Sequence, residues 1–422
     1  MISAIVILVC IAVYYIIGKN CQSLILTVLS GYIYWLVAPS SLYLILGTSL
    51  VMAGYGQIIP RCQRKWILCQ PILLLIIGFI LFRYLSSSVG SPLGYSVVAF
   101  SAISLLVDQY RTGLKYSYID CLSSLLFAPK IFAGPIVRAN NFISSEAKRF
   151  DWSLIYKGLK YLIFAAFCKL IAGDILTNIE CDQTGFTLFF QILLFGLNFF
   201  FDFWAYSMMA IGAGMIMGYE LPISFNRPYY STSFRSFWHR WNITLGTWLR
   251  DYIYIPMGGK CNSGLKWCVS ILSVFIISGL WHGSTWPFLL WGVIHGLLLI
   301  IERFIIRPER LKKFGKVSYG IVVFVLVSFL WQLFIIDDVS VLSNRVGSLF
   351  TISEFNWAVS IRFLISFIVM AGLTNPSAMD LIENNSKRHT DIIKEVTMLS
   401  LMLLSLVIFN CPLSFNFFYF RF

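Results

Sequence analysis

The chain has 422 residues, of which 58% are hydrophobic and only 12% are charged. Soluble domains carry about 25% charged residues, so this composition excludes an ordinary soluble protein. The net charge of +13 does not indicate a nucleic-acid partner, because Lys and Arg occur in short clusters between apolar runs and not along one stripe. We therefore expect an all-α, polytopic membrane protein.

Apolar runs long enough to cross a bilayer, about 20 residues each, recur along the whole chain. The first run starts at the second residue without a basic segment or a cleavage site, so we expect it to be retained as a span. The sequence predicts about eleven to twelve transmembrane helices. The candidate spans are 2–17, 22–38, 42–59, 67–84, 93–107, 156–174, 186–216, 267–280, 286–301, 317–336, 359–374 and 395–410.

The loops between these spans differ in charge from one side of the membrane to the other. Nearly all Lys and Arg lie in loops that share one side, whereas the opposite loops at 85–92, 175–185 and 337–358 hold almost none. Because positively charged loops stay in the cytoplasm, both termini of the chain, which we place in the inner (cytoplasmic) membrane of a cell from the resemblance described below, are predicted to lie outside the cytoplasm. No internal repeat or low-complexity linker interrupts the chain, so we expect residues 1–422 to form a single membrane domain.

Two apolar stretches are interrupted by helix-breaking residues. Residues 119–137 contain two prolines and a glycine, and residues 241–257 contain a glycine, a proline and an Arg–Asp pair. Broken backbone at membrane depth is tolerated only where protein or water surrounds it. We predict that both stretches are re-entrant segments that line a central tunnel open to the cytoplasm.

Histidine is the residue type that most narrows the search for chemistry, since the chain has only four. His282 lies between two predicted spans and is flanked by Gly279 and Gly283, which allow close approach of backbone or ligand. An ionisable residue at membrane depth is a functional hypothesis, and histidine suits proton transfer from a hydroxyl. The alternative is a buried histidine held by one hydrogen bond. His389 lies in a polar run and is given no role.

The other two histidines have weaker signals. His295 is in the middle of a predicted span, where helix packing is as good an explanation as catalysis. His239 lies beside Trp238 and Arg240, where contact with a phosphate or the surface is favoured over catalysis. The basic residues Arg227, Arg235, Arg240, Arg250 and Lys260 could neutralise the phosphates of a nucleotide-like acyl carrier, or could only reflect topology.

Several familiar chemistries have no signature here. The ten cysteines show no CxxC pair, so neither a metal site nor a disulfide framework is predicted. The chain also lacks a G-x-S-x-G elbow, an HExxH motif, a phosphate loop and a dinucleotide fingerprint.

Three strings in the middle of the chain resemble a known family. They are FAPKIFAGPIVR (127–138), SFWHRWNITLGTWLRDYIYIPMGG (236–259) and GLWHGSTWPFLLWGVIHGLLL (279–299). In this order they resemble the core of the membrane-bound O-acyltransferase family, in its bacterial branch of alginate O-acetylation and teichoic acid D-alanylation proteins. The terminal FFYFRF is similar to the alginate-type ending. The resemblance is densest over about 120–302.

The resemblance implies a tunnel with His282 as its catalytic histidine. Asn242 matches a second family position, which is usually histidine in the alginate-type branch. Asparagine can orient a carbonyl or an acceptor but cannot take a proton, so we expect His282 to be the general base. We expect further residues to line the tunnel or bind the donor: Trp238, Arg240, Arg250, Asp251, Lys260, Trp281 and His295.

The resemblance also implies a reaction and its partners. The donor would be acyl-CoA, most simply acetyl-CoA, used as a substrate without a bound cofactor. The acceptor would be a hydroxyl of a cell-envelope polysaccharide, reached with an extracytoplasmic acyltransferase or acceptor protein, and membrane lipid would surround the enzyme. The alternatives are a transporter or lipid-linked glycan flippase, and a non-catalytic scaffold. Matching half-repeats, which transporters usually carry, are not apparent in the sequence.

Overall fold

The structure is a computed structural model, and all regular elements in the part of the chain that it describes are helices. The described residues are 2–62, 64–85, 92–131, 134–143, 148–170, 184–259, 263–336, 338–352, 355–383 and 389–408. The expected all-α membrane fold is confirmed.

Six of the described helices are long and apolar enough to cross a membrane, or seven if one pair bent by 54° counts as one span. The six are Pro39–Cys62, Lys65–Tyr84, Gly185–Ile216, Gly264–His282, Trp286–Ile306 and Lys313–Phe334. This number is below the eleven to twelve that we expected from apolar runs. The expected spans at 2–17 and 22–38 fall on shorter apolar helices, and the one at 156–174 runs into residues that are not described.

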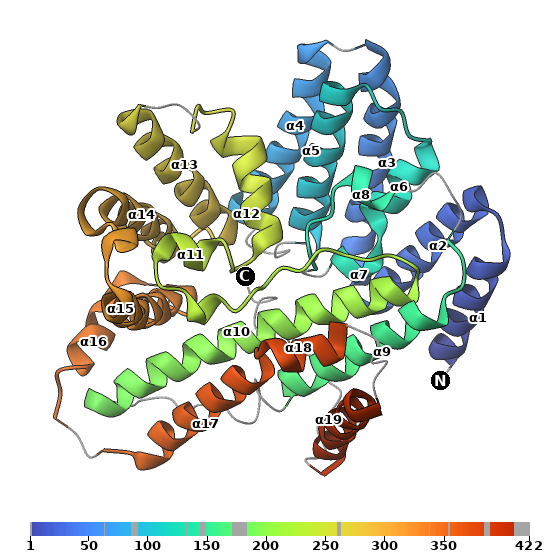
Figure 1. Ribbon diagram of the computed structural model, residues 1–422. Helices are drawn as coiled ribbons and strands as arrows, with labels where there is room; N and C mark the ends of the chain where they lie inside the picture. The colour runs from blue at the N-terminus through green and yellow to red at the C-terminus, as the bar shows by residue number, and fades with distance from the viewer. Residues whose placement is uncertain are drawn as a thin grey trace. The chain divides into compact units, whose positions relative to one another are not determined.

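The chain divides into two units, each of which packs mainly within itself (Figure 1). The first unit holds Met1–Leu159 and Met209–Pro222, and the second holds Lys160–Met208 and Ile223–Phe422. The helices that begin in the first unit are α1 (Ile2–Ile16), α2 (Lys19–Val37), α3 (Pro39–Cys62), α4 (Lys65–Ile80), η1 (Leu81–Leu85), α5 (Tyr95–Thr112), α6 (Tyr118–Leu126), α7 (Ala128–Ile131), α8 (Ala139–Phe142) and α9 (Trp152–Phe167).

The core of the first unit lies between α2, α3, α5 and α6. Gly56 of α3 allows α5 and α6 to approach, because a Cβ there would stand 3.2 Å from the Gln109 side-chain oxygen and 3.3 Å from the Cys121 sulfur. The Gln109 amide donates to the Gly56 carbonyl at 3.1 Å. Small residues that bring backbones together, joined by side-chain hydrogen bonds, are typical of packing inside membranes.

The second unit contains the aromatic-rich region that the sequence singled out. Its helices are most of α10 (Gly185–Ile216), η3 (Pro228–Tyr230), α11 (Phe234–Trp238), α12 (Ile243–Leu249), η4 (Arg250–Tyr254), α13 (Gly264–His282), α14 (Trp286–Ile301), η5 (Glu302–Ile306), η6 (Pro308–Arg310), α15 (Lys313–Trp331), η7 (Gln332–Phe334), α16 (Val339–Ser348), α17 (Trp357–Leu373), α18 (Pro376–Glu383) and α19 (His389–Ile408).

Both stretches that we expected to be broken consist of short helices. Residues 119–137 form most of α6, then α7, and residues 134–138 have no helical structure. Residues 241–257 form α12, a π-helical turn at η4 and a run of turns. Pro135 lies in the non-helical residues 134–138 and Pro256 lies in the run of turns, whereas Gly246 lies inside α12. The return of each stretch to the same membrane face stays a prediction.

Helices α13 and α14 form a tight hairpin in the second unit (Figure 1). A Cβ on Gly279 would collide with the backbone oxygen of Phe288, and one on Gly292 would collide with the backbone oxygen of Phe275. The two backbones therefore touch at two glycines. This close packing fixes the end of α13, where His282 is the last residue.

Candidate active site

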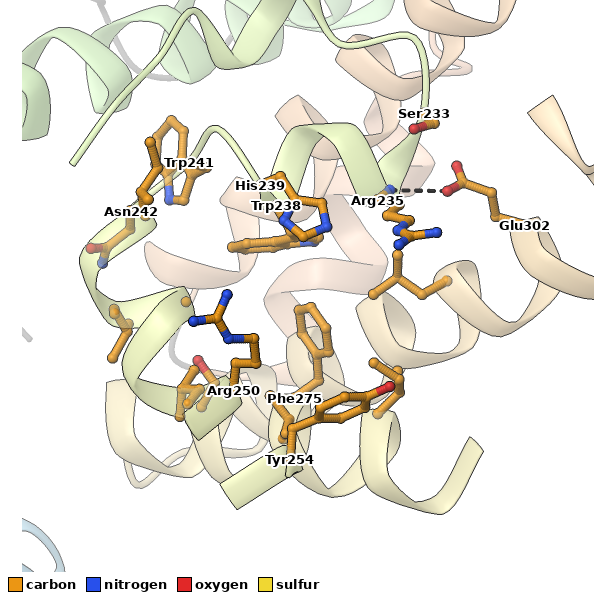
Figure 2. Close-up of a pocket in the computed structure, with 18 of the residues that line it drawn as sticks. Ser233, Arg235, Trp238, His239, Trp241, Asn242, Arg250, Tyr254, Phe275 and Glu302 are labelled. Atoms are coloured by element: carbon orange, nitrogen blue, oxygen red, sulfur yellow. Dashed lines mark hydrogen bonds between the residues drawn. The ribbon is translucent and has the colours of Figure 1, made fainter. Parts of the chain in front are cut away.

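A cavity of about 1150 Å³ lies in the second unit, bordered by α11, α12, α13, α14 and α15 (Figure 2). Its lining includes Asn242 and His282, which are 40 positions apart in the sequence. Part of the lining is charged and exposed, as at Arg235 and Arg250, and part is aromatic and buried, as at Trp291. Segment 241–257 contributes to this lining, and segment 119–137 belongs to the first unit.

His282 is 9% exposed and its ring is packed among aromatic side chains. The ring centroid lies 4.3 Å from Trp281, 4.8 Å from Phe334 and 5.2 Å from Trp291. Gly283 follows with extended backbone, and a Cβ at that position would run into the Phe288 ring. The glycine therefore lets α14 start directly beside the imidazole, which places a titratable ring at the surface of the cavity.

Asn242 begins α12 in a left-handed conformation, with φ at +42°. Asn, Asp and His are the non-glycine residues most often found in this region. Two backbone hydrogen bonds hold the turn: the Asn226 N–H donates to the Arg240 carbonyl at 2.9 Å, and the Ile243 N–H donates to the Ser224 carbonyl at 2.8 Å. The Asn242 side chain does not cap α12, so the turn leaves its amide to line the cavity.

His295 lies behind the wall of the cavity, among the residues that the structure describes, and does not itself line it. It is completely buried, and its centroid lies 4.9 Å from both Trp238 and Trp291. Neither ring nitrogen of His295 has a hydrogen-bond partner among the described residues, and neither does the indole nitrogen of Trp238 or of Trp291. Trp238 and Trp291 face the cavity.

Of the charged residues that we expected at the site, some line the cavity and others do not. Arg250 lines the cavity and forms a two-point ion pair with Asp251, with N–O distances of 2.7 and 3.2 Å. The Arg250 side chain is 54% exposed and that of Asp251 is 17% exposed. Arg240 and Trp281 are not among the described lining residues, and Lys260 lies outside the described residues. A guanidinium held by a neighbouring carboxylate can still present its other N–H groups to an anion.

His239 also lines the cavity, next to two cations. Burial lowers the pKa of His239 below its ordinary value of 6.5, and the guanidiniums of Arg235 and Arg250 lower it further. The ring is therefore neutral at neutral pH. A neutral imidazole offers one donor and one acceptor to a ligand without adding charge.

Sequence reasoning missed Glu302, a buried carboxylate that lines the same cavity. It accepts hydrogen bonds from the backbone of α11, 67 and 68 positions earlier in the chain. In the sequence, Glu302 is a single acidic residue at the end of a long apolar run, and this position could have indicated a buried carboxylate. Sequence reasoning also assigned Arg303 to topology alone, whereas its guanidinium lies 4.1 Å from the Trp267 ring centroid at the cavity.

The family profile of membrane-bound O-acyltransferases matches residues 3–336 of the chain. The chain belongs to the membrane-bound O-acyltransferase family. It is a multi-pass membrane enzyme that transfers an acyl group to a hydroxyl. The transporter alternative is therefore not retained.

This membrane-bound O-acyltransferase is similar to proteins that act on three different envelope polymers. The chain is 28% identical to the probable alginate O-acetylase AlgI of Pseudomonas putida over 408 residues, covering 86% of this chain and 82% of the relative. It is 30% identical to the peptidoglycan O-acetyltransferase of Helicobacter pylori over 230 residues, 51% of this chain and 44% of the relative. It is 26% identical to the teichoic acid D-alanyltransferase of Bacillus subtilis over 288 residues, 60% of this chain and 72% of the relative.

Proposed function

We propose that this enzyme transfers an acetyl group from acetyl-CoA at the cytoplasmic face to a hydroxyl of a cell-envelope polysaccharide, with an extracytoplasmic partner completing the transfer. One observation carries the proposal: a single cavity contains His282, Asn242 and the exposed cations Arg235 and Arg250. The relatives that modify alginate, peptidoglycan and teichoic acid support an envelope polymer as acceptor. Two of these three relatives are acetyl transferases, which favours acetyl over D-alanyl.

The chemistry requires a base beside the reacting carbonyl. In the proposed mechanism His282 takes the proton of the acceptor hydroxyl as its oxygen attacks the thioester carbon. The new C–O bond forms, the C–S bond breaks, and the proton passes from His282 to the leaving thiolate of CoA. The Asn242 amide N–H donates to the carbonyl oxygen, on which negative charge develops during the attack.

The surroundings of His282 suit this role. Rings of Trp281, Trp291 and Phe334 surround the imidazole, so little water reaches it. Exclusion of water limits hydrolysis of the thioester. Arg235 and Arg250 would pair with the phosphates of CoA, because guanidinium groups bind phosphate at two points. Cytoplasmic entry of the donor follows from the predicted topology, with both termini outside the cytoplasm.

The test uses purified enzyme in vesicles, with and without whatever candidate partner protein is encoded beside it. Acetyl-CoA labelled in the acetyl group is added on one side of the membrane. The release of free CoA is measured, and so is the label that reaches the partner protein and the added envelope polysaccharide. We expect CoA release that depends on the partner or on the polysaccharide, with label on a hydroxyl ester. If no acyl-CoA is turned over in the presence of the partner, the proposed donor is wrong. If a parallel assay with a labelled D-alanyl thioester gives transfer and acetyl-CoA gives none, acetyl is wrong and the acyl-transfer mechanism stands.

A further inference from the structure

Glu302 makes three hydrogen bonds that tie the end of α14 to the start of α11. One carboxylate oxygen accepts from the backbone N–H of Phe234 at 2.6 Å and from the Tyr319 hydroxyl at 3.2 Å. The other accepts from the backbone N–H of Arg235 at 2.9 Å. Glu302 is 4% exposed. Loss of any of these hydrogen bonds would leave a buried polar group without a partner, which destabilises the folded protein. The three bonds therefore indicate a structural role for the Glu302 carboxylate.

Helix α11 has only five residues, which is too short to be stable in isolation. Its first backbone N–H groups have no partner inside the helix. Glu302 satisfies those of Phe234 and Arg235, and the Ser233 hydroxyl satisfies that of Ser236 at 2.9 Å. The Ser233 cap and the Glu302 carboxylate therefore hold the start of α11, together with the packing of its buried Phe234 and Phe237 side chains.

Helix α11 carries a large part of the cavity wall, as Figure 2 shows. Arg235 and Trp238 lie on it, and His239 is its C-terminal cap. All three line the cavity, and the chain continues directly to Asn242. A rotation of α11 would move the cation, the indole and the imidazole together, while His282 on the α13–α14 hairpin would stay in place.

We propose that Glu302 is a positioning residue that holds α11 in the orientation required to bind the acyl donor. The inference rests on the proposed function, because it assigns the donor to the wall that α11 forms. Glu302 acts through Arg235, Trp238 and His239 and does not itself touch the reacting atoms. The same cavity contains a second acidic residue, Glu309, which is exposed and makes no hydrogen bond to α11 among the described residues.

The geometry predicts which substitutions fail and why. An amide at this position has one acceptor oxygen and one NH2 group. In Glu302→Gln the NH2 group faces a backbone N–H that a carboxylate oxygen accepts in the wild-type enzyme, so at least one of these bonds is lost. Glu302→Asp keeps both acceptor oxygens on a shorter side chain, so it should keep more of the hydrogen bonds to α11 than Glu302→Gln does. Glu309→Gln makes the same change of charge in the same cavity and is the matched control.

The first measurement is hydrogen–deuterium exchange of the full-length enzyme in detergent, which requires no knowledge of the donor. We expect Glu302→Gln to accelerate exchange of the backbone amides of 233–241, with Glu302→Asp intermediate and Glu309→Gln like wild type. Unchanged exchange of 233–241 in Glu302→Gln would overturn the positioning role. Because this result is independent of turnover, it stands or falls separately from the proposed function.

The second measurement is steady-state kinetics with acetyl-CoA and an acceptor. We expect Glu302→Gln to raise KM for acetyl-CoA about tenfold, with a smaller change in kcat and an unchanged acceptor KM. Loss of folded enzyme would instead lower kcat and leave both KM values unchanged, and that result would overturn the inference. If wild type turns over no acyl-CoA but 233–241 responds to Glu302→Gln, the proposed function fails and the structural role of Glu302 remains.

Discussion

The glycine packing between α13 and α14 gives a sharp prediction about how His282 is positioned. In Gly279→Ala the new Cβ collides with the backbone oxygen of Phe288, and neither backbone can move without separating the hairpin. Overpacking of this kind costs about 1–3 kcal/mol. Gly279 lies three residues before His282, at the end of the same helix, so a shift of about 1 Å there reaches the imidazole. Displacement of a catalytic group by that amount lowers the rate about a hundredfold.

The assay compares Gly279→Ala with Gly54→Ala, in which nothing lies within 4 Å of the added Cβ. Both changes add one methyl group to a membrane-spanning helix. We expect Gly279→Ala to lower the melting temperature in detergent and to lower acetyl-CoA turnover about a hundredfold. Gly54→Ala should keep both near wild type. Equal behaviour of the two variants would refute the claim that close backbone packing positions His282.

Three further predictions concern the polar side of the cavity. Because the pKa of His239 is lowered in the folded enzyme, the unfolded chain binds a proton at this residue before the folded enzyme does as the pH falls below about 6.5. The stability of the folded enzyme should therefore decrease from about pH 7 to pH 5. Thermal melts over this pH range should show a smaller decrease for His239→Gln than for wild type. Arg250→Ala should raise KM for acetyl-CoA about tenfold with little change in kcat, whereas Lys313→Ala, at an exposed position outside the lining, should change neither. Asn242→Ala should lower kcat about a hundredfold, and Asn242→His, which also suits a positive φ, should keep more activity than Asn242→Ala in the same kinetic assay.

Much of the site was predictable because its signals are local. The Trp-His-Gly string and the break at 241–257 are visible in the sequence, and the structure brings His282 and Asn242 to one cavity. The left-handed backbone at Asn242 suits asparagine and would also suit histidine, since both residue types tolerate that conformation. The catalytic roles of the two residues stay predictions.

Other features were beyond the sequence because they depend on tertiary packing. Glu302 binds backbone 67 and 68 positions away, and no periodicity links the two segments. His295, which we expected to line the tunnel or bind the donor, packs against Trp238 and Trp291 and is not among the described residues that line the cavity. The described residues hold six or seven candidate spans, and hydropathy alone does not tell which of the other apolar runs are full spans and which are shorter helices.

The role of His282 as the base is tested by comparing His282→Ala with His389→Ala, a change at a histidine to which we assign no role. Binding of acetyl-CoA and release of CoA are measured on the same purified samples with the partner present. We expect His282→Ala to bind acetyl-CoA like wild type and to release CoA at least about a thousandfold more slowly, whereas His389→Ala stays active. Wild-type release of CoA by folded His282→Ala would contradict the assignment of His282 as the base.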